Sequence, residues 1–199
     1  MYDFIVLMGE AGSGKDRTMK EILEANRKLP PEEKLPIHEV ISCTTRPIRQ
    51  NEAHGVNYFY YTPEQFGQKV LDGEMLECTV FNDWFYGTSF ESVRSDGVIN
   101  IGVFNPTGVE SLLARPDCNV LVFWIKTNDK TRLMRQLNRE ENPDVREVVR
   151  RFQADYNDFD GLEDEFPVIV LKNDTEEDLK RNVEEILCQS GHHFARGQK

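Results

Sequence analysis

The sequence lacks any apolar run that approaches the length of a membrane-spanning helix. Its start does not resemble a secretion signal, because the acidic Asp3 interrupts a very short apolar stretch. It also lacks closely spaced cysteines: Cys43, Cys78, Cys118 and Cys188 are far apart and show no metal-type pairing. We therefore expect four reduced thiols, a cytoplasmic location and no membrane partner.

Basic residues are also fewer than acidic ones. The chain has 24 Lys and Arg against 35 Asp and Glu, which gives a formal net charge of −11. This balance argues against nucleic acid or an anionic membrane surface as the main partner. An acidic chain that binds anions must gather its basic residues locally. At 199 residues the chain suits one α/β domain with a substantial core, and we see no internal repeat.

Strand-like and helical patterns alternate along most of the chain. Strands are predicted over 4–8, 39–42, 98–103, 120–125 and 168–171. Helices are predicted over 16–29, 107–114, 130–140, 145–159 and 175–187. This order predicts a parallel sheet flanked by helices. Residues 44–89 differ, because short aromatic strands and a helix over 66–71 predict a small, mostly antiparallel lobe, and 189–199 has no periodicity and is expected to be a loose tail.

A glycine-rich run follows the first strand. It reads Gly9-Glu10-Ala11-Gly12-Ser13-Gly14-Lys15 and leads directly into a helical pattern. Glycines let successive backbone N–H groups converge on a phosphate, the lysine reaches the β- and γ-oxygens, and the helix adds the positive end of its dipole. A flexible turn is the alternative, but the strand before and the helix after favour a nucleotide-phosphate site. Asp16 stands where the usual pattern has the Ser or Thr that holds Mg²⁺.

Two clusters of arginines are candidates for further anion binding. Arg46 and Arg49 follow a strand, and Pro47 keeps Arg46 extended. The second cluster spans two predicted helices and comprises Lys130, Arg132, Arg135, Arg139, Arg146, Arg150 and Arg151. The alternatives are solvated arginines in the first cluster and ordinary pairing along a helix face in the second.

Tyrosines and one glutamate lie between the two arginine clusters. Tyr58 and Tyr86 could donate to a phosphate, and the Glu77 carboxylate could accept two N–H bonds from a purine edge. Alternatively, Tyr58 and Tyr86 only pack within the small lobe, and Glu77 is a solvated residue of a strand.

These motifs together resemble the guanylate kinase family. The central resemblance is the run from 42 to 59, which reads SCTTRPIRQNEAHGVNYF. GEMLE at 73–77 and YGTS at 86–89 follow at the distance that the family shows. The glycine-rich loop upstream, the two basic helices and VIVLKND at 168–174 complete the order, so the resemblance covers nearly the whole chain except the tail.

The resemblance implies a kinase of three parts in a single domain. Its core would comprise 1–43, 90–128 and 160–188, its nucleoside-monophosphate lobe 44–89 and its helical lid 129–159. The implied reaction is ATP-dependent phosphorylation of GMP or dGMP to GDP or dGDP, with Mg²⁺ as cofactor. A monomer or a homodimer is expected.

The resemblance also implies a role for each matching residue. The donor ATP would be held by Gly9, Gly12, Ser13, Gly14, Lys15, Asp16, Arg17 and Asn173. The GMP phosphate would be held by Arg46, Arg49, Tyr58 and Tyr86, and the guanine would be read by Ser42, Glu77 and Thr88. Catalytic charge would come from Lys15, Arg135, Arg139 and Arg151, although Arg139 is displaced by one residue from the family's spacing.

The chain departs from the family at two places. Asp16 replaces the hydroxyl that holds Mg²⁺, and it could hold the ion directly or through water. Val103 and Asn105 replace the two acids of the family's Asp-x-Asp. The departures leave open a kinase for another (deoxy)nucleoside monophosphate. A binding module without turnover is less favoured, because such domains usually lose the loop lysine or glycines that this chain keeps.

Overall fold

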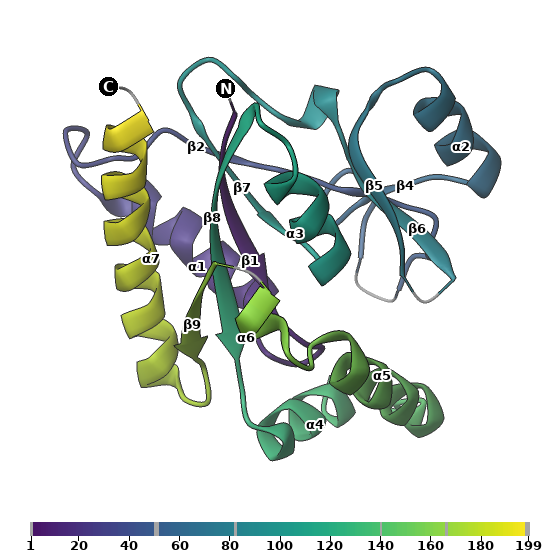
Figure 1. Ribbon diagram of the computed structural model, residues 1–199. Coiled ribbons are helices and arrows are strands. Elements are labelled where there is room, and N and C mark those ends of the chain that lie inside the picture. The colour runs from purple at the N-terminus through teal and green to yellow at the C-terminus, as the bar shows by residue number, and fades with distance from the viewer. Residues whose placement is uncertain (1, 50–51, 82, 140, 166, 198–199) are drawn as a thin grey trace.

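The computed structural model describes residues 2–49, 52–81, 83–139, 141–165 and 167–197. Its centre is a five-stranded parallel sheet in the order β2-β7-β1-β8-β9 (Figure 1). The strands are β1 (Tyr2–Met8), β2 (Ile37–Glu39), β7 (Ile99–Val103), β8 (Cys118–Lys126) and β9 (Val168–Lys172). In the register Ile5 of β1 lies between Ile101 and Leu121. The predicted parallel sheet is therefore confirmed.

Helices cover both faces of this sheet (Figure 1). Alternate residues of β1 point to opposite faces, so Phe4 enters one apolar cluster and Ile5 enters the other. The first cluster is closed by α3 (Pro106–Leu113) and α6 (Leu162–Glu165), and the second by α1 (Lys15–Lys28) and α7 (Glu176–Gly197). Strands that are buried on both faces read as continuous apolar runs, which is the pattern that made them predictable.

A second, four-stranded sheet forms the small lobe at the side of the core (Figure 1). Its order is β4-β3-β6-β5, and its elements are β3 (Cys43–Thr44), β4 (Phe59–Tyr60), α2 (Pro63–Leu71), β5 (Met75–Phe81) and β6 (Trp84–Ser89). The β3–β4 pair is parallel and the others are antiparallel, so the sheet is mixed. Phe66 of α2 is buried and stacks on Phe85 at 5.5 Å between ring centroids, which fixes the helix to the sheet. The 3₁₀ turn η1 (Phe90–Ser92) leads back to the core.

Two helices lie together beyond the carboxyl end of β8 (Figure 1). These lid helices are α4 (Asp129–Leu137) and α5 (Val145–Asp158). The Asn128 side chain accepts from the Thr131 N–H at 2.9 Å, and Asp144 caps α5 in the same way. α4 begins just after β8, and α5 begins just after Pro143. Both helices contact the loop that follows β1.

The structure differs from the sequence-based expectations at three places. β2 ends at Glu39 instead of running to residue 42, because the chain then leaves β7 and crosses to the lobe, where Ser42 O accepts from Phe59 N. The expected loose tail is wrong for its described backbone, since α7 continues to Gly197 with Ser190 buried and its hydroxyl bonded to Ile186 O at 2.6 Å. α4 ends at Leu137, and Glu140, the last residue of the expected helix, lies outside the described residues.

A search of the described helices for a long apolar segment finds none that could cross a membrane.

Candidate active site

The glycine-rich loop between β1 and α1 forms the floor of the candidate site. Gly12 and Gly14 have φ angles of +81° and +94°, a region that side chains disfavour. A Cβ on Gly12 would lie 2.6 Å from the Arg132 carbonyl oxygen, and one on Gly14 would lie 2.6 Å from Asn173 Nδ2. The loop therefore needs glycine for its conformation and for its close approach to two neighbouring segments.

Lys15 and Asp16 follow the loop at the start of α1. The Lys15 ammonium donates to Glu10 O at 3.4 Å and lies 4.0 Å from Asp16 Oδ2. Lys15 is mostly covered, with 20% of its side chain exposed, whereas Asp16 is 70% exposed. Arg17 points elsewhere, because its guanidinium binds both Glu176 oxygens at 2.6 and 2.7 Å. Lys15 is thus positioned to meet phosphate oxygens, and Arg17 joins α1 to α7.

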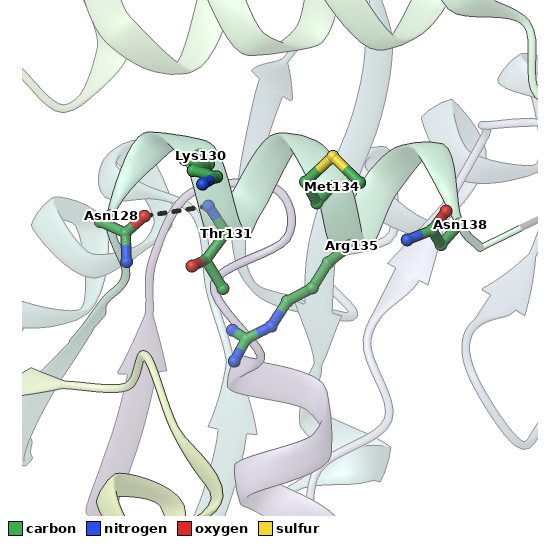
Figure 2. Close-up of a pocket in the computed structure, with 6 residues that line it drawn as sticks. All are labelled: Asn128, Lys130, Thr131, Met134, Arg135 and Asn138. Atoms are coloured by element: carbon green, nitrogen blue, oxygen red, sulfur yellow. Dashed lines mark hydrogen bonds between the residues drawn. The ribbon is translucent and has the colours of Figure 1, made fainter.

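Asn173 and Arg135 lie behind the loop rather than above it. Asn173 is buried and its Nδ2 donates to Ser13 O at 2.8 Å. Arg135 Nη1 donates to Gly12 O and Ser13 O at 3.3 and 3.2 Å, and its Nη2 donates to Asn173 O at 3.1 Å. Figure 2 shows the Arg135 side chain leaving α4 on the side of the loop, next to a 620 Å³ surface pocket that it lines. In this state its guanidinium supports the loop backbone.

Arg46 and Arg49 follow β3 at the start of the lobe, and together with the glycine-rich loop they line the candidate site. Arg46 is 4% exposed, and its Nη2 donates to the two Glu52 oxygens at 3.1 and 3.0 Å. Glu52 also accepts from the Arg49 N–H at 2.9 Å and from the Tyr60 hydroxyl at 2.8 Å. Burial and then the charges of Arg46 and Arg151 lower the pKa of Arg49, which shows how closely the positive charges gather. Arginine remains charged in such surroundings, so the cluster attracts an anion.

The lid contributes Arg139 and Arg151 to this charge. Arg151 Nε donates to Glu147 at 2.6 Å, and Arg139 is 57% exposed and lies 4.0 Å from a Glu52 oxygen. The lid and the lobe therefore meet through opposite charges at one side of the cavity. An acidic chain has gathered its cations locally, as binding of an anion requires.

Tyrosines line the same wall. The Tyr58 ring lies 6.1 Å from the Tyr86 ring and 5.5 Å from the Arg46 guanidinium carbon. Burial, and then the negative charge of Asp16, raise the pKa of the Tyr58 hydroxyl. The hydroxyl therefore keeps its proton at neutral pH and can donate it to an anion.

A buried glutamate closes the far end of the lobe. Glu77 of β5 pairs with Thr88 of β6 and is 8% exposed. Burial raises the pKa of Glu77 to about 7, and Thr88 beside it offsets part of that rise. The Thr88 hydroxyl is itself buried and makes no well-formed hydrogen bond with the described residues. A buried acceptor and a buried hydroxyl beside it form a polar end that a ligand with matching hydrogen bonds would satisfy.

The two positions that depart from the family's acids lie at the end of β7. Val103 has no side-chain oxygen. The Asn105 oxygen accepts from the Gly108 N–H at 2.8 Å, and its amide donates to Thr79 Oγ1 at 3.2 Å. Asn105 therefore caps α3 and ties it to the lobe.

One cavity of 540 Å³ joins these parts. The expected site residues that line it are Gly9, Gly12, Gly14, Lys15, Asp16, Arg17, Ser42, Arg46, Arg49, Tyr58, Glu77, Tyr86, Arg135, Arg139 and Arg151. Ser13, Thr88 and Asn173 lie behind its wall and are buried. Gln50 and Asn51, in the resembling run, lie outside the described residues.

Sequence reasoning missed three residues that support the site. Glu52 organises Arg46 and Arg49, although it lies inside the resembling run between Arg49 and Tyr58. Asp155 of α5 accepts from the Ala11 N–H of the loop at 2.8 Å. The Thr127 hydroxyl lies 2.9 Å from both Ser13 O and Asn173 O. Of these three, only Glu52 gave a signal in the sequence, because it follows Arg46 and Arg49 closely in the resembling run.

Comparisons with known proteins agree with this arrangement. A family model described as guanylate kinase matches residues 1–190. A guanylate kinase of Shouchella clausii is 39% identical over 98 residues, which are 49% of this chain and less than half, 43%, of that relative. One from Legionella pneumophila is 30% identical over 176 residues, 86% of this chain and 78% of the relative.

A solved structure supports the fold separately. The crystal structure of guanylate kinase from Anaplasma phagocytophilum has a TM-score of 0.66 and 21% sequence identity, and the match covers 95% of this chain and 86% of that one. The family model spans most of the sequence, including the loop, the lobe and the lid helices. The chain belongs to the guanylate kinase family.

Proposed function

We propose that this chain transfers the γ-phosphoryl group of ATP to GMP or dGMP, giving GDP or dGDP. The observation that supports this most is the single 540 Å³ cavity, which joins a phosphate loop, an arginine and tyrosine cluster and a buried carboxyl group. Two phosphate sites facing one another are what a phosphoryl transfer needs, and the carboxyl group at the far end suits a base with adjacent N–H donors.

The donor would bind along the loop. The N–H groups of Gly12, Gly14 and Lys15 and the start of α1 would hold the β- and γ-phosphates, with Lys15 offsetting their charge. Ser13 and Asn173 would support the loop from behind, as their burial and bonding suggest. The adenine would lie near Arg135 and Asn173, at the pocket shown in Figure 2.

The acceptor would bind in the lobe. Arg46, Arg49, Tyr58 and Tyr86 would hold its phosphate, and one phosphate oxygen would attack the γ-phosphorus while the bond to the β–γ bridging oxygen breaks. The electron pair of that bond leaves with ADP. Lys15, Arg139 and Arg151 would stabilise the charge that develops between donor and acceptor, which is the main work of the protein in such a reaction.

Mg²⁺ fits this site through Asp16. The described residues contain no group of three or more His, Cys, Asp or Glu that could form a cage for a metal. A single exposed carboxylate beside the loop is nevertheless suitable, because Mg²⁺ is usually held by one or two carboxylates, waters and substrate phosphates. When bound, the ion would supply positive charge to the β- and γ-phosphates.

The Asp16→Ala variant is expected to weaken the apparent Mg²⁺ affinity at least roughly tenfold while changing the GMP affinity little. Without a cation, a carboxylate beside the donor phosphates would only repel them. The measurement is a Mg²⁺ titration of the rate and of ADP binding. Asp16→Ser should keep activity, and Glu21→Ala, an exposed acid further along α1, is the matched control. An unchanged Mg²⁺ dependence in Asp16→Ala would reduce Asp16 to a helix-start acid.

The kcat/KM for GMP is expected to fall as the pH drops below about 7. Guanine offers hydrogen-bond donors, so Glu77 must be ionised to accept from them, and burial raises its pKa to about 7. The loss should approach tenfold per pH unit, roughly 1.4 kcal/mol. A phosphate monoester also titrates near pH 6, about one unit lower, so the same profile is measured for Glu77→Gln. Identical profiles in the two proteins would contradict the assignment.

The function itself is tested by a coupled assay with ATP and Mg²⁺ across all ribo- and deoxyribonucleoside monophosphates. We expect GMP and dGMP to be the preferred acceptors. Preference for another monophosphate would move the chain to a different acceptor class, and no turnover with any of them would favour a binding role. The cytoplasmic location and the choice between monomer and homodimer remain predictions.

A further inference from the structure

Both polar groups of one residue in the phosphate loop are held by the lid helices. The Ala11 N–H donates to Asp155 Oδ2 of α5 at 2.8 Å. The Ala11 carbonyl accepts from Arg132 Nε of α4 at 3.2 Å. Arg132 and Asp155 bind each other as well, with Nη2 and Oδ2 3.0 Å apart. One ion pair, built from two helices, thus clamps one peptide segment of the loop from both sides.

This ion pair is buried. The Arg132 side chain is 3% exposed and that of Asp155 is 8% exposed. Arg132 also lies 3.5 Å from Glu10, a loop residue that accepts from the Trp124 indole at 3.1 Å, and its guanidinium covers the Phe152 ring at 4.7 Å. Burying a pair of charges is costly unless the geometry is good, so such a pair adds little net stability compared with apolar residues of the same size. Stabilisation of the fold alone therefore gives little reason for a buried ion pair at this place.

The neighbouring carbonyls of the loop face the same helix. Gln136 Nε2 donates to Ala11 O at 3.2 Å, and Arg135 Nη1 donates to Gly12 O and Ser13 O. A peptide unit is planar and trans, so its C=O and the next residue's N–H point in opposite directions. Carbonyls held toward α4 turn the N–H groups of Gly12 and Gly14 away from it, which is the orientation that phosphate binding requires, while the Ser13 N–H donates to Glu10 O at 3.1 Å within the loop.

We propose that Arg132 and Asp155 are positioning residues, which set the phosphate loop in its phosphate-binding shape before a nucleotide arrives. The inference rests on the proposed function in one respect, that the loop binds donor phosphates. Asp155 lines the 540 Å³ cavity, but one of its carboxylate oxygens is already bonded to the Ala11 N–H and to Arg132, which lies outside the lining. The pair acts through the Ala11 backbone, and it makes the two lid helices and the loop one connected unit.

The test uses Arg132→Met, Asp155→Leu and the double variant. The melting temperature reports the stability of the fold, and the ADP affinity reports the shape of the phosphate loop. Arg132→Met leaves the buried Asp155 and Glu10 carboxylates without this cation, and Asp155→Leu leaves Arg132 with Asp129 at 3.1 Å and Glu10 at 3.5 Å, so both should melt at lower temperature than the parent. The double variant replaces the pair by apolar side chains and should recover part of the melting temperature, because the buried Glu10 still loses Arg132. ADP affinity, measured by calorimetry with Mg²⁺, should nevertheless stay about tenfold or more weaker in all three, because a displaced loop loses aligned N–H groups.

Two controls sharpen this experiment. GMP affinity should remain within about twofold of the parent, since its site lies in the lobe. Arg146→Met makes the same change of charge at an exposed position of α5 and should alter neither value. Asp155→Asn keeps an acceptor for the Ala11 N–H, so its ADP affinity should fall between those of the parent and Asp155→Leu.

The outcomes distinguish this proposal from the proposed function. Recovery of both melting temperature and ADP affinity in the double variant would show a purely structural pair and overturn the proposal, as would parental ADP affinity in every variant. If Arg132→Met and Asp155→Leu do not fold, the double variant and the milder Asp155→Asn decide the question. A parent that binds ADP but phosphorylates no GMP would contradict the proposed function alone, whereas a parent that does not bind ADP would overturn the positioning role as well.

Discussion

Replacing Lys15 by alanine is expected to lower kcat by at least roughly two orders of magnitude, about 3 kcal/mol in activation free energy, while the protein stays folded. Lys15 is mostly covered and lies at the start of α1, where its ammonium contacts a loop carbonyl at 3.4 Å and Asp16 at 4.0 Å, so we expect its charge to act on the donor phosphates. The measurement is the steady-state rate with ATP and GMP, together with circular dichroism and a thermal melt.

Lys28→Ala is the matched control for that experiment. Lys28 lies on the same helix, is 73% exposed and pairs only with Glu24 among the described residues, at 3.2 Å. Exposed pairs of this kind contribute little, so neither rate nor melting temperature should change by much. A well-folded Lys15→Ala variant with near-parental turnover would remove the catalytic role of the loop lysine.

Glu77→Ala is expected to collapse the preference for GMP over AMP. Guanine presents N1–H and N2–H₂ as adjacent donors, which one carboxylate can accept, whereas adenine presents a lone pair at N1. A site built for those bonds discriminates by about 10⁴ or more, because a wrong base leaves its buried polar groups unpaired. The variant should lose kcat/KM for GMP and dGMP sharply and change little with AMP. An unchanged ratio would exclude Glu77 as the residue that reads the base.

Arg49→Ala tests the phosphate in the same assay and should reduce every monophosphate alike. It is a cleaner choice than Arg46→Ala, which would remove the guanidinium 3.0 Å from the buried Glu52 and leave that carboxylate with the more distant Arg139 at 4.0 Å. The Arg49 guanidinium is instead crowded by Arg46 and Arg151. Comparing the two variants on GMP and AMP separates base recognition from phosphate binding.

Glu77→Gln checks that folding is not the cause. The folded-state pKa of Glu77, about 7, is higher than the ordinary 4.5. The group therefore stabilises the unliganded fold fully only below pH 4.5, and this contribution disappears as the pH rises to 7. Glutamine does not titrate, so the melting temperature of the variant should rise relative to the parent across that interval. Selectivity lost in a variant that is at least as stable at pH 7 belongs to the base contact.

Much of the fold was predictable because local and global signals agree. The apolar run before Gly9 and the run over 120–125 have the continuous character of central parallel strands, and they form β1 and β8. The end of β2 was not predictable, because Val40 and Ile41 remain apolar while the chain changes sheets. The helical tail was missed for a similar reason, since Ser190 and Gly191 weaken the periodicity although Ser190 is buried.

The site residues were predictable where they belong to a short sequence motif with its own chemistry. Gly12, Lys15, Arg46 and Arg49 belong to short motifs whose chemistry is local, and all line the cavity. Arg132 and Asp155 could not be paired from the sequence, because 23 residues separate them and each reads as a helix-face charge. The inward turn of Arg135 toward loop carbonyls depends on how α4 docks, which no local pattern specifies.

The lobe leaves and re-enters the core on neighbouring strands, because Cys43 of β3 pairs with Gly87 of β6. Residues expected to contact the acceptor, such as Arg49, Tyr58 and Glu77, fall within this excursion, whereas the phosphate loop and the lid helices are encoded outside it. The lobe is therefore one continuous insertion, from β3 to β6, whose first and last strands lie side by side. Because the ends of the insertion are adjacent, we expect that grafting another lobe between residues 40–42 and 90–98 would change the preferred acceptor and keep the proposed donor site.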